Sequence, residues 1–443
     1  MPSWRDLQFK RVSPSLLLAI GLNLACTLCV VWANNGWAND ETVTKLTLSE
    51  LLNMAFKENL GLKIEQQEYT SDSATESATF RKLLPSFSLA SGATETLNDS
   101  TLLDDETSNY VSSLVLEQAI YQPALMASWH KSELNLKKAD YNLKRLTQKL
   151  VFDVKRAWYQ VLQEQVLLAE SETALARLKQ HKQNAEAFYK TGKIWRNDLL
   201  QANVRVTRGE QELFAARNRV TLAKSQINVL LNRAIDSPFT PDGKLEWVEF
   251  KQTLEPLMQQ AMGNRLDIKQ SQLDIKIATT DKSLVEAKFK PTINFKLTNR
   301  VSSTDFDYGS SSNQTTASVN LNWNFYQFGQ TSREVSSARA KVTARKLALQ
   351  QKKTEIMLEV QQAYLAVKES QYSLSVSEQA LQQSLENFRV SQIRYKEQLG
   401  SSNDVLDAQD LLTQTRTDRV KALSRYLTAL AELNFALGSS ARR

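Results

Sequence analysis

The side chains able to do catalytic or metal chemistry are few and scattered in this 443-residue sequence. The two histidines, His130 and His181, are isolated within one predicted helix, and the two cysteines, Cys26 and Cys29, lie in an apolar run near the N-terminus. This distribution argues against a Cys/His metal site and against a disulfide scaffold. The sequence also offers no glycine-rich phosphate loop, no paired carboxylates between a strand and a loop, and no Ser/His/Asp set near a predicted pocket. We therefore expect no cofactor, no bound metal and no enzymatic activity.

Two aspartates stand out by their spacing. Asp404 and Asp407 lie three residues apart at the start of a predicted helix, so their side chains share one face of it. The local sequence favours a structural role, in which a cap at Ser402 or Asn403 is followed by first-turn acids that complement the helix dipole. Asp198 stands at the start of an earlier predicted helix, and we expect it to do only the capping job.

The elements that must position these side chains are long helices. The sequence has only 12 glycines and 8 prolines, and none of them lies between Pro123 and Gly192 or between Gly329 and Gly400. Helix-forming residues fill both windows, and apolar residues recur every three or four positions. Such spacing over more than about 25 residues indicates coiled-coil packing, so we predict two long antiparallel helical hairpins. The shorter second helices of the hairpins are expected at about 198–232 and 404–437.

The two hairpins belong to a tandem repeat with an offset of about 206 residues. Segment 197–200 (NDLL) corresponds to segment 403–406 (NDVL), and Pro85 corresponds to Pro291 at the same offset. One large unit is therefore duplicated, in contrast to the short period of a solenoid.

Between the helices, each half carries two short segments with the periodicity of a strand. In the clearest segment, 317–326, bulky apolar residues alternate with polar ones, most of which are asparagines. This alternation fits a membrane strand with lipid on one face and water on the other, although a half-buried hairpin of a soluble protein would look alike. The other three segments lie at about 85–94, 110–121 and 291–301. The predicted lipid face of the membrane strand consists of Val319, Leu321, Trp323 and Phe325.

Four membrane strands cannot close a barrel, because about eight is the smallest number known. An open sheet in lipid would leave backbone N–H and C=O groups unpaired at its edges, at a cost of several kcal/mol each. If these segments are membrane strands, the protein must oligomerise, and three chains would supply twelve strands.

The N-terminus has the features of an export signal. Basic residues precede an apolar run over 16–31, and small residues suited to cleavage follow at Ala33 and Ala38. This order is typical of a secretory signal peptide, predicted here for residues 1–38. An N-terminal membrane anchor and lipidation at Cys26 are the alternatives. No other stretch approaches 18 consecutive apolar residues, so we expect an exported mature protein without a transmembrane helix.

Taken together, these features make the sequence resemble the TolC-type outer-membrane efflux protein family over essentially the whole mature chain. The resemblance rests on the duplication, on the order of elements in each half, and on a hairpin-tip motif, Y-x-x-G followed by D-x-L-x-A. The first copy of the motif reads Tyr189, Gly192, Asp198, Leu200 and Ala202. The second copy has Tyr395, Asp404, Leu406 and Ala408. Gln398 replaces the glycine there, with Gly400 two residues later, so the shape of the second turn is left open.

The resemblance implies a mainly α fold with β-strands, built from a duplicated helix–strand–strand–long helix–helix unit. Three chains would form a 12-stranded outer-membrane β-barrel on a 12-helix periplasmic α-barrel of long coiled-coil hairpins. The implied divisions are a first repeat at 39–232 (strands about 85–121, hairpin 124–232), an equatorial connector at 233–262, a second repeat at 263–438 (strands about 291–327, hairpin 330–437) and a tail at 439–443.

The same resemblance implies a passive export duct of a tripartite efflux pump or a type I secretion system, in the outer membrane and extending into the periplasm of a Gram-negative cell. The implied partners are two further copies in a homotrimer, a periplasmic adaptor (membrane fusion) protein, an inner-membrane transporter of RND, ABC or MFS type, and outer-membrane lipid. No nucleic acid is expected, because the basic residues alternate with apolar ones along solvated helix faces. A soluble periplasmic coiled-coil scaffold or adaptor is the alternative, and the transported substrate is left open.

The family's constriction aspartates fall by position on Asp404 and Asp407. In three copies they would form a ring of carboxylates that attracts cations at the tunnel entrance. This role and the capping role can coexist. The residues implied to dock partners at the hairpin tips are Tyr189, Gly192, Asp198, Leu200, Tyr395, Gly400, Val405 and Leu406.

Overall fold

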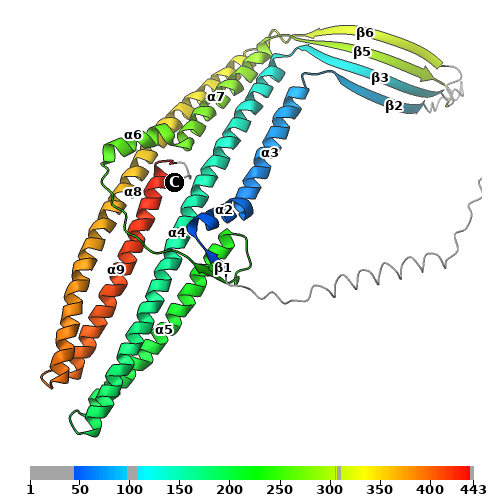
Figure 1. The fold of residues 1–443 in the computed structure, drawn as a ribbon. Helices are drawn as coiled ribbons and strands as arrows, with labels where there is room; N and C mark the ends of the chain where they lie inside the picture. Colours follow the sequence, from blue (N-terminus) through cyan, green and yellow to red (C-terminus); the bar gives the residue numbers. More distant parts are fainter. Residues whose placement is uncertain (1–43, 97–106, 305, 307–310, 440–443) are drawn as a thin grey trace, which may run out of the picture. The chain divides into compact units, whose positions relative to one another are not determined.

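The computed structural model describes residues 44–96, 107–304, 306 and 311–439 (Figure 1). The predicted signal peptide with Cys26, and the predicted tail beyond Ser439, lie outside these residues. The described chain divides into two compact units, of which the smaller holds Thr44, Lys45 and Pro238–Thr240. Strands β1 (Thr44–Leu46) and β4 (Phe239–Pro241) form a two-stranded sheet.

All the other elements belong to the larger unit, in which one series of elements occurs twice. The first series is α2 (Leu48–Glu58), α3 (Leu60–Arg81), β2 (Ser86–Thr96), β3 (Thr107–Tyr121), α4 (Pro123–Lys190) and α5 (Arg196–Leu230). The second is α6 (Leu254–Asn264), α7 (Leu266–Glu286), the 3-10 turn η1 (Ala287–Phe289), β5 (Thr292–Ser303), β6 (Ser311–Asn322), α8 (Gln330–Lys396) and α9 (Ser402–Ala436). A mostly helical chain with some strands, as predicted, is thereby confirmed.

The two long helices fill the windows that lack glycine and proline. Helix α4 has 68 residues and α8 has 67, so each is about 100 Å long at 1.5 Å per residue. Pro123 occupies the first turn of α4, where its missing N–H costs nothing. Side chains at three- and four-residue spacing are buried along both helices, as Val154 and Trp158 show in α4 and Val360 and Ala363 in α8. The periodic apolar stripe is therefore what each helix packs against its neighbours.

Contacts between helices place the two halves side by side. Toward the hairpin ends, α4 lies between α5 and α9, and α9 lies between α4 and α8 (Figure 1). Near the strands, α4 contacts α3 and α7, and α7 contacts α8. The elements of the first half thus occupy one side of the helical layer and those of the second half the other.

A buried ion cluster joins the second half together where α7 begins. The guanidinium of Arg265, whose side chain is 2% exposed, donates to Asp267 at 2.5 Å and to Glu359 of α8 at 2.8 Å. It also donates to the carbonyl of Ala436 at the end of α9. Burial acts against the charged form of Arg265, but the two carboxylates outweigh it and raise the pKa of this guanidinium. One side chain thereby anchors three helices.

The four longer strands form an antiparallel sheet in the order β2-β3-β5-β6. Its two faces differ in polarity, as two neighbouring rows of directly paired residues show. The row Phe87, Leu116, Leu297 and Ala317 is apolar. The adjacent row, which points to the opposite face, consists of Ser86, Glu117, Lys296 and Ser318.

Strand β6 is displaced from its predicted position. It spans Ser311–Asn322, whereas the alternating pattern predicts 317–326. Its last residue pairs with Thr292, the first residue of β5, and the proline before Thr292 has no N–H to extend the ladder. The predicted lipid-face residues Trp323 and Phe325 therefore follow the strand instead of lying in it. At the other end, the Ser- and Thr-rich residues 311–316 continue the pairing with β5.

Candidate functional site at the hairpin tips and the strand face

Both helical hairpins turn through the same backbone hydrogen bonds, related by the offset of the repeat. Gly192 (φ 70°) and Gln398 (φ 60°) occupy the same left-handed position in the two turns. The sequence left the shape of the second turn open, and its backbone proves to have the same shape as the first, because Gln398 takes the conformation of the glycine. Gly400 is not among the residues with positive φ, and a Cβ added there would lie 3.2 Å from that of Arg394.

The helices that follow the turns begin differently. Helix α9 has its cap at Ser401, not at Ser402 or Asn403 as predicted. The Ser401 hydroxyl accepts from the amide of Asp404 at 3.1 Å, and the Asp404 carboxylate accepts from the amide of Ser401 at 2.9 Å, which completes a capping box. These hydrogen bonds, from the Ser401 backbone and then its side chain, hold the pKa of Asp404 below its usual value.

Helix α5 has Trp195 at the corresponding cap position, and no side-chain hydrogen bond caps it. The indole N–H can only donate, so it cannot satisfy a helix amide. Asp198 is the acid of the first turn, where it complements the helix dipole, but the predicted capping hydrogen bond is absent. The two tips thus share a turn and differ in the cap.

The second constriction candidate, Asp407, makes an ion pair with the other hairpin. Its side chain is 76% exposed, and its Oδ1 lies 3.7 Å from Nη2 of Arg205 on α5. The same guanidinium donates through Nη1 to Asp410, one turn further along α9. Local sequence does not mark Arg205 as functional, because its partners are about two hundred residues away. The only available signal is that Asp410 continues the three-residue spacing of Asp404 and Asp407.

Tyr395 and His181 lie inside the second tip. The Tyr395 side chain is 6% exposed, whereas its repeat counterpart Tyr189 is 41% exposed. The Tyr395 ring lies 5.3 Å from the ring of His181 and 5.5 Å from that of Phe188, both on α4. His181 Nε2 is 2.9 Å from the hydroxyl of Ser402, and burial lowers the pKa of this histidine. His181, one of the two isolated histidines of the sequence, therefore joins the two hairpins.

The residues expected to dock partners differ in exposure, and Asp198 and Gly400 are only partly exposed. Tyr395, Val405 and Leu406 are buried, so they support the tip from inside and do not present a surface. Tyr189 and Leu200 have exposed side chains, and Gly192 is exposed in its turn. The most exposed apolar side chains of the two tips are ones that the motif does not include, Trp195 at 84% and Leu399 at 72%.

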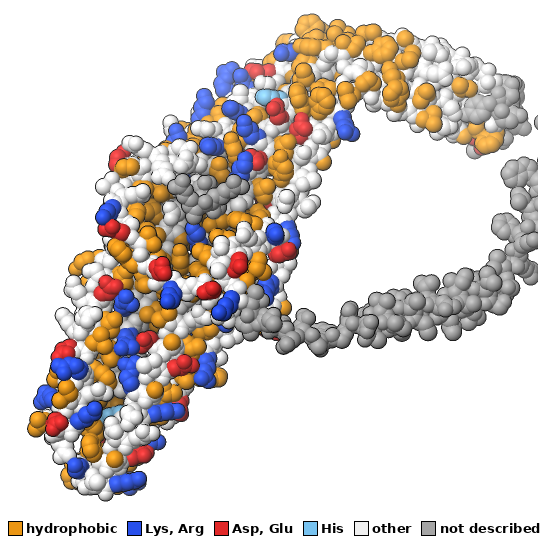
Figure 2. Space-filling view, viewed as in Figure 1, with side chains coloured by type: hydrophobic (Ala, Val, Ile, Leu, Met, Phe, Trp, Pro, Cys, Tyr) orange, Lys and Arg blue, Asp and Glu red, His pale blue; other side chains and the backbone are white. Residues whose placement is uncertain are grey.

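The apolar face of the sheet is open in the single chain. Val319, Leu321, Trp323 and Phe325 are all exposed, as are Phe87 and Leu89 of β2. Figure 2 shows hydrophobic side chains gathered over the strands, while most charged side chains lie over the helices. The Trp323 indole donates to the carbonyl of Phe289 at 2.9 Å, which holds the segment after β6 against the end of η1. None of the described helices is both long and apolar enough to cross a membrane.

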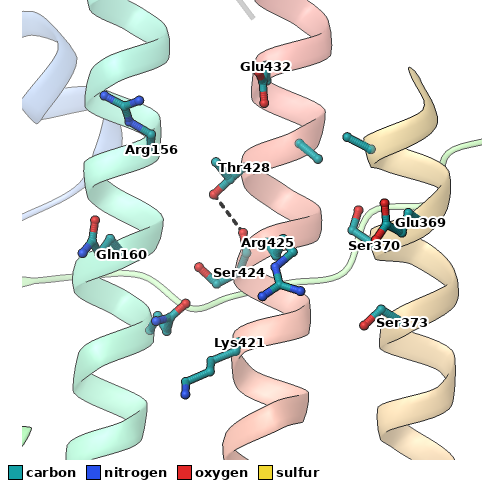
Figure 3. A pocket seen from close by; sticks show the side chains of 13 residues that line it. Arg156, Gln160, Glu369, Ser370, Ser373, Lys421, Ser424, Arg425, Thr428 and Glu432 are labelled. Carbon is teal, nitrogen blue, oxygen red and sulfur yellow. Dashed lines mark hydrogen bonds between the residues drawn. The ribbon is translucent and has the colours of Figure 1, made fainter. Parts of the chain in front are cut away.

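A polar cavity of about 460 Å³ lies among α4, α8 and α9 (Figure 3). Its lining carries both signs of charge, with Arg156, Lys421 and Arg425 near Glu369 and Glu432. Among the described residues, no three His, Cys, Asp or Glu side chains come together as a metal site would require. The cavity has neither a nucleophile–base pair nor a concentrated charge, so the tips and the strand face remain the candidate functional sites.

Comparison with known proteins agrees with this geometry. Residues 257–439 match the family model described as "Outer membrane efflux protein". No curated protein sequence matches the chain. The fold of the chain is shared by solved structures of low sequence identity.

Three of these structures are similar over nearly their whole length. The Campylobacter jejuni CmeC outer membrane channel is 14% identical, with a TM-score of 0.79 over 91% of this chain and 90% of that one. The Neisseria gonorrhoeae MtrE outer membrane channel in its open state is 18% identical, with a TM-score of 0.75 over 89% and 90%. The Vibrio cholerae outer membrane protein VceC is 16% identical, with a TM-score of 0.75 over 88% and 96%.

Proposed function

We propose that this chain is the outer-membrane exit channel of a tripartite efflux pump or a type I secretion system. The observation that carries the proposal is the four-stranded sheet, which has an exposed apolar face, a polar opposite face, and β2 and β6 as its edges. A sheet with these two faces suits a wall between lipid and water. The long hairpins that continue from it would extend about 100 Å into the periplasm.

Closure of the wall requires further copies of the chain. In lipid the backbone groups at the edges of β2 and β6 must be paired, and four strands are too few to pair with each other around a pore. Three copies, each joining β6 to β2 of the next, would make a closed ring of twelve strands by head-to-tail contacts. A homotrimer is therefore the assembly we propose.

The helical layer also has apolar edges that a second copy would cover. Helix α5 and helix α8 are the outer helices at the tip end, and both carry exposed apolar side chains at roughly helical spacing. On α5 these are Leu200, Val204, Phe214, Leu222 and Val229. On α8 they include Leu347, Leu358, Leu365, Tyr372, Val376 and Val390. The same head-to-tail arrangement that joins β6 to β2 would bring α8 of one copy to α5 of the next.

Transport through this channel would be passive. The carboxylates of Asp404 and Asp407 would surround the narrow periplasmic entrance, and a periplasmic adaptor and an inner-membrane transporter would meet the tips and open it. The exposed side chains of Tyr189, Trp195 and Leu399 are the docking surface we propose. No covalent bond is made or broken in this mechanism, so the chain needs no catalytic group.

Membrane fractionation followed by an unboiled gel tests the proposal. We expect the protein in the outer membrane as a trimer that migrates faster or slower than the boiled chain, and we expect stepwise conductance when the purified trimer is added to planar bilayers. A soluble monomer in the periplasmic fraction would contradict the proposal and would favour a coiled-coil scaffold instead.

A further inference from the structure

Arginines of the first hairpin lie against the acidic start of α9. Arg205 pairs with both Asp407 and Asp410. Arg208, one turn further along α5, also acts on Asp410 through its positive charge. Asp404 completes the acidic face, with one carboxylate oxygen held by the capping hydrogen bond from Ser401. Two carboxylates of the second hairpin, Asp407 and Asp410, thus lie near guanidinium groups of the first, whereas the arginine that acts on Asp404 is Arg394 of its own hairpin.

The ion pairs of Arg205 affect the electrostatic potential at the tip more than they affect the free energy of folding. The Arg205 side chain is about one-third exposed, and that of Asp407 is mostly exposed. Exposed ion pairs contribute little to folding free energy, because water screens them and the side chains lose entropy. Their effect on the local potential persists, since a charge near a narrow passage acts directly on the ions that enter it.

We propose that Arg205 sets the ion selectivity of the channel entrance in this protein. The inference rests on the proposed function, since Asp404 and Asp407 must line the entrance for their charge to reach passing ions. Arg205 offsets one carboxylate in every copy, so the entrance is less anionic than its aspartates alone would make it. Removing the guanidinium would add one net negative charge per chain and three in the proposed trimer.

The test uses the full-length protein, purified from outer membranes and reconstituted in planar bilayers. The measurements are the reversal potential in a KCl gradient and the concentration of hexaamminecobalt(III), added on the tip side, that halves the conductance. We expect Arg205→Gln to shift the reversal potential toward greater K⁺ selectivity and to lower the blocking concentration by about tenfold, because Coulomb attraction at the entrance increases. Arg205→Lys should stay close to the unmodified protein, because it keeps the positive charge.

A second variant separates charge from structure. In Arg205→Gln/Asp407→Asn both partners of the pair are neutral, so the net charge of the entrance returns to its original value. We expect the reversal potential and the blocking concentration to return to those of the unmodified protein. If Arg205 only held the helices together, the double variant would still lack the ion pair and these values would not return. An unboiled gel of each variant verifies that the trimer has assembled.

Two results would overturn the inference. Reversal potential and block that do not change in Arg205→Gln would show that this charge is not felt by ions. A larger conductance with unchanged selectivity in Arg205→Gln would show that Arg205 only holds α5 and α9 together. Absence of channels from the unmodified protein would contradict the proposed function itself, and the inference would fall with it.

Discussion

Gly192 and Gln398 occupy the same left-handed position at the ends of the two long helices, although only one of them is a glycine. The residues around them make identical backbone hydrogen bonds, so the second hairpin turns as the first does. A residue with a Cβ is strained in this conformation by about 1–2 kcal/mol. The second tip is therefore built on a strained turn, and the first tip is not.

Replacing the strained residue should stabilise the second tip. We expect Gln398→Gly to raise the local free energy of opening by about 0.5–1 kcal/mol, because relief of strain exceeds the entropy that glycine loses on folding. Hydrogen exchange at the tip amides should then slow by about two- to fivefold. Glu397→Gly is the matched control, because Glu397 has φ −80° and gains nothing from glycine. Faster exchange in Gln398→Gly would contradict the claim that Gln398 is strained in its left-handed conformation.

The capping box of α9 should make the start of this helix sensitive to acid. Because the pKa of Asp404 is lowered in the folded protein, its contribution to stability is fully present above the usual value of 3.8 and is lost as pH falls through the lower folded value. We expect Ser401→Ala to cost about 1 kcal/mol of local stability and to weaken this acid dependence. Hydrogen exchange of the first turn of α9, followed from neutral to acid pH, measures both. Helix α5, which has no side-chain cap, should show no such loss.

A charge on the apolar face of the sheet should prevent assembly in the membrane. Val319 and Asn320 are neighbours in β6 and point to opposite faces. We expect Val319→Arg to cost about 2–4 kcal/mol per chain near the bilayer centre and to reduce the heat-modifiable trimer in the outer membrane. Asn320→Arg, on the polar face, should leave the amount of trimer nearly unchanged. Equal loss in both variants would contradict the assignment of lipid and water faces.

Neutralising the tip carboxylates should weaken block by multivalent cations. We expect Asp404→Asn/Asp407→Asn to raise the blocking concentration of hexaamminecobalt(III) in bilayers by about tenfold or more, because six carboxylates leave the proposed trimeric entrance. Asp198→Asn is the control, since it removes a first-turn acid at the corresponding place of the other hairpin. If the double variant is blocked at the same concentration as the unmodified protein, Asp404 and Asp407 do not form the constriction.

The periodic parts of this protein can be read from its sequence. Windows free of glycine and proline predict both long helices to within a few residues, and alternation of apolar and polar residues identifies the strands. These patterns are local, because a helix or a strand face is set by residues a few positions apart. The duplication is equally visible, since it needs only a comparison of the chain with itself.

Pairings between distant segments were decided by the tertiary structure. Strand β6 ends at Asn322 because its partner strand begins at Thr292. The alternation of apolar and polar residues, taken alone, predicts a strand that continues to residue 326. Arg205 reaches Asp407, and His181 reaches Ser402, only because helices of the two halves lie side by side. Local periodicity determined which face of each element is apolar. Which faces meet, and which charges are thereby neutralised, depends on the packing of the whole chain.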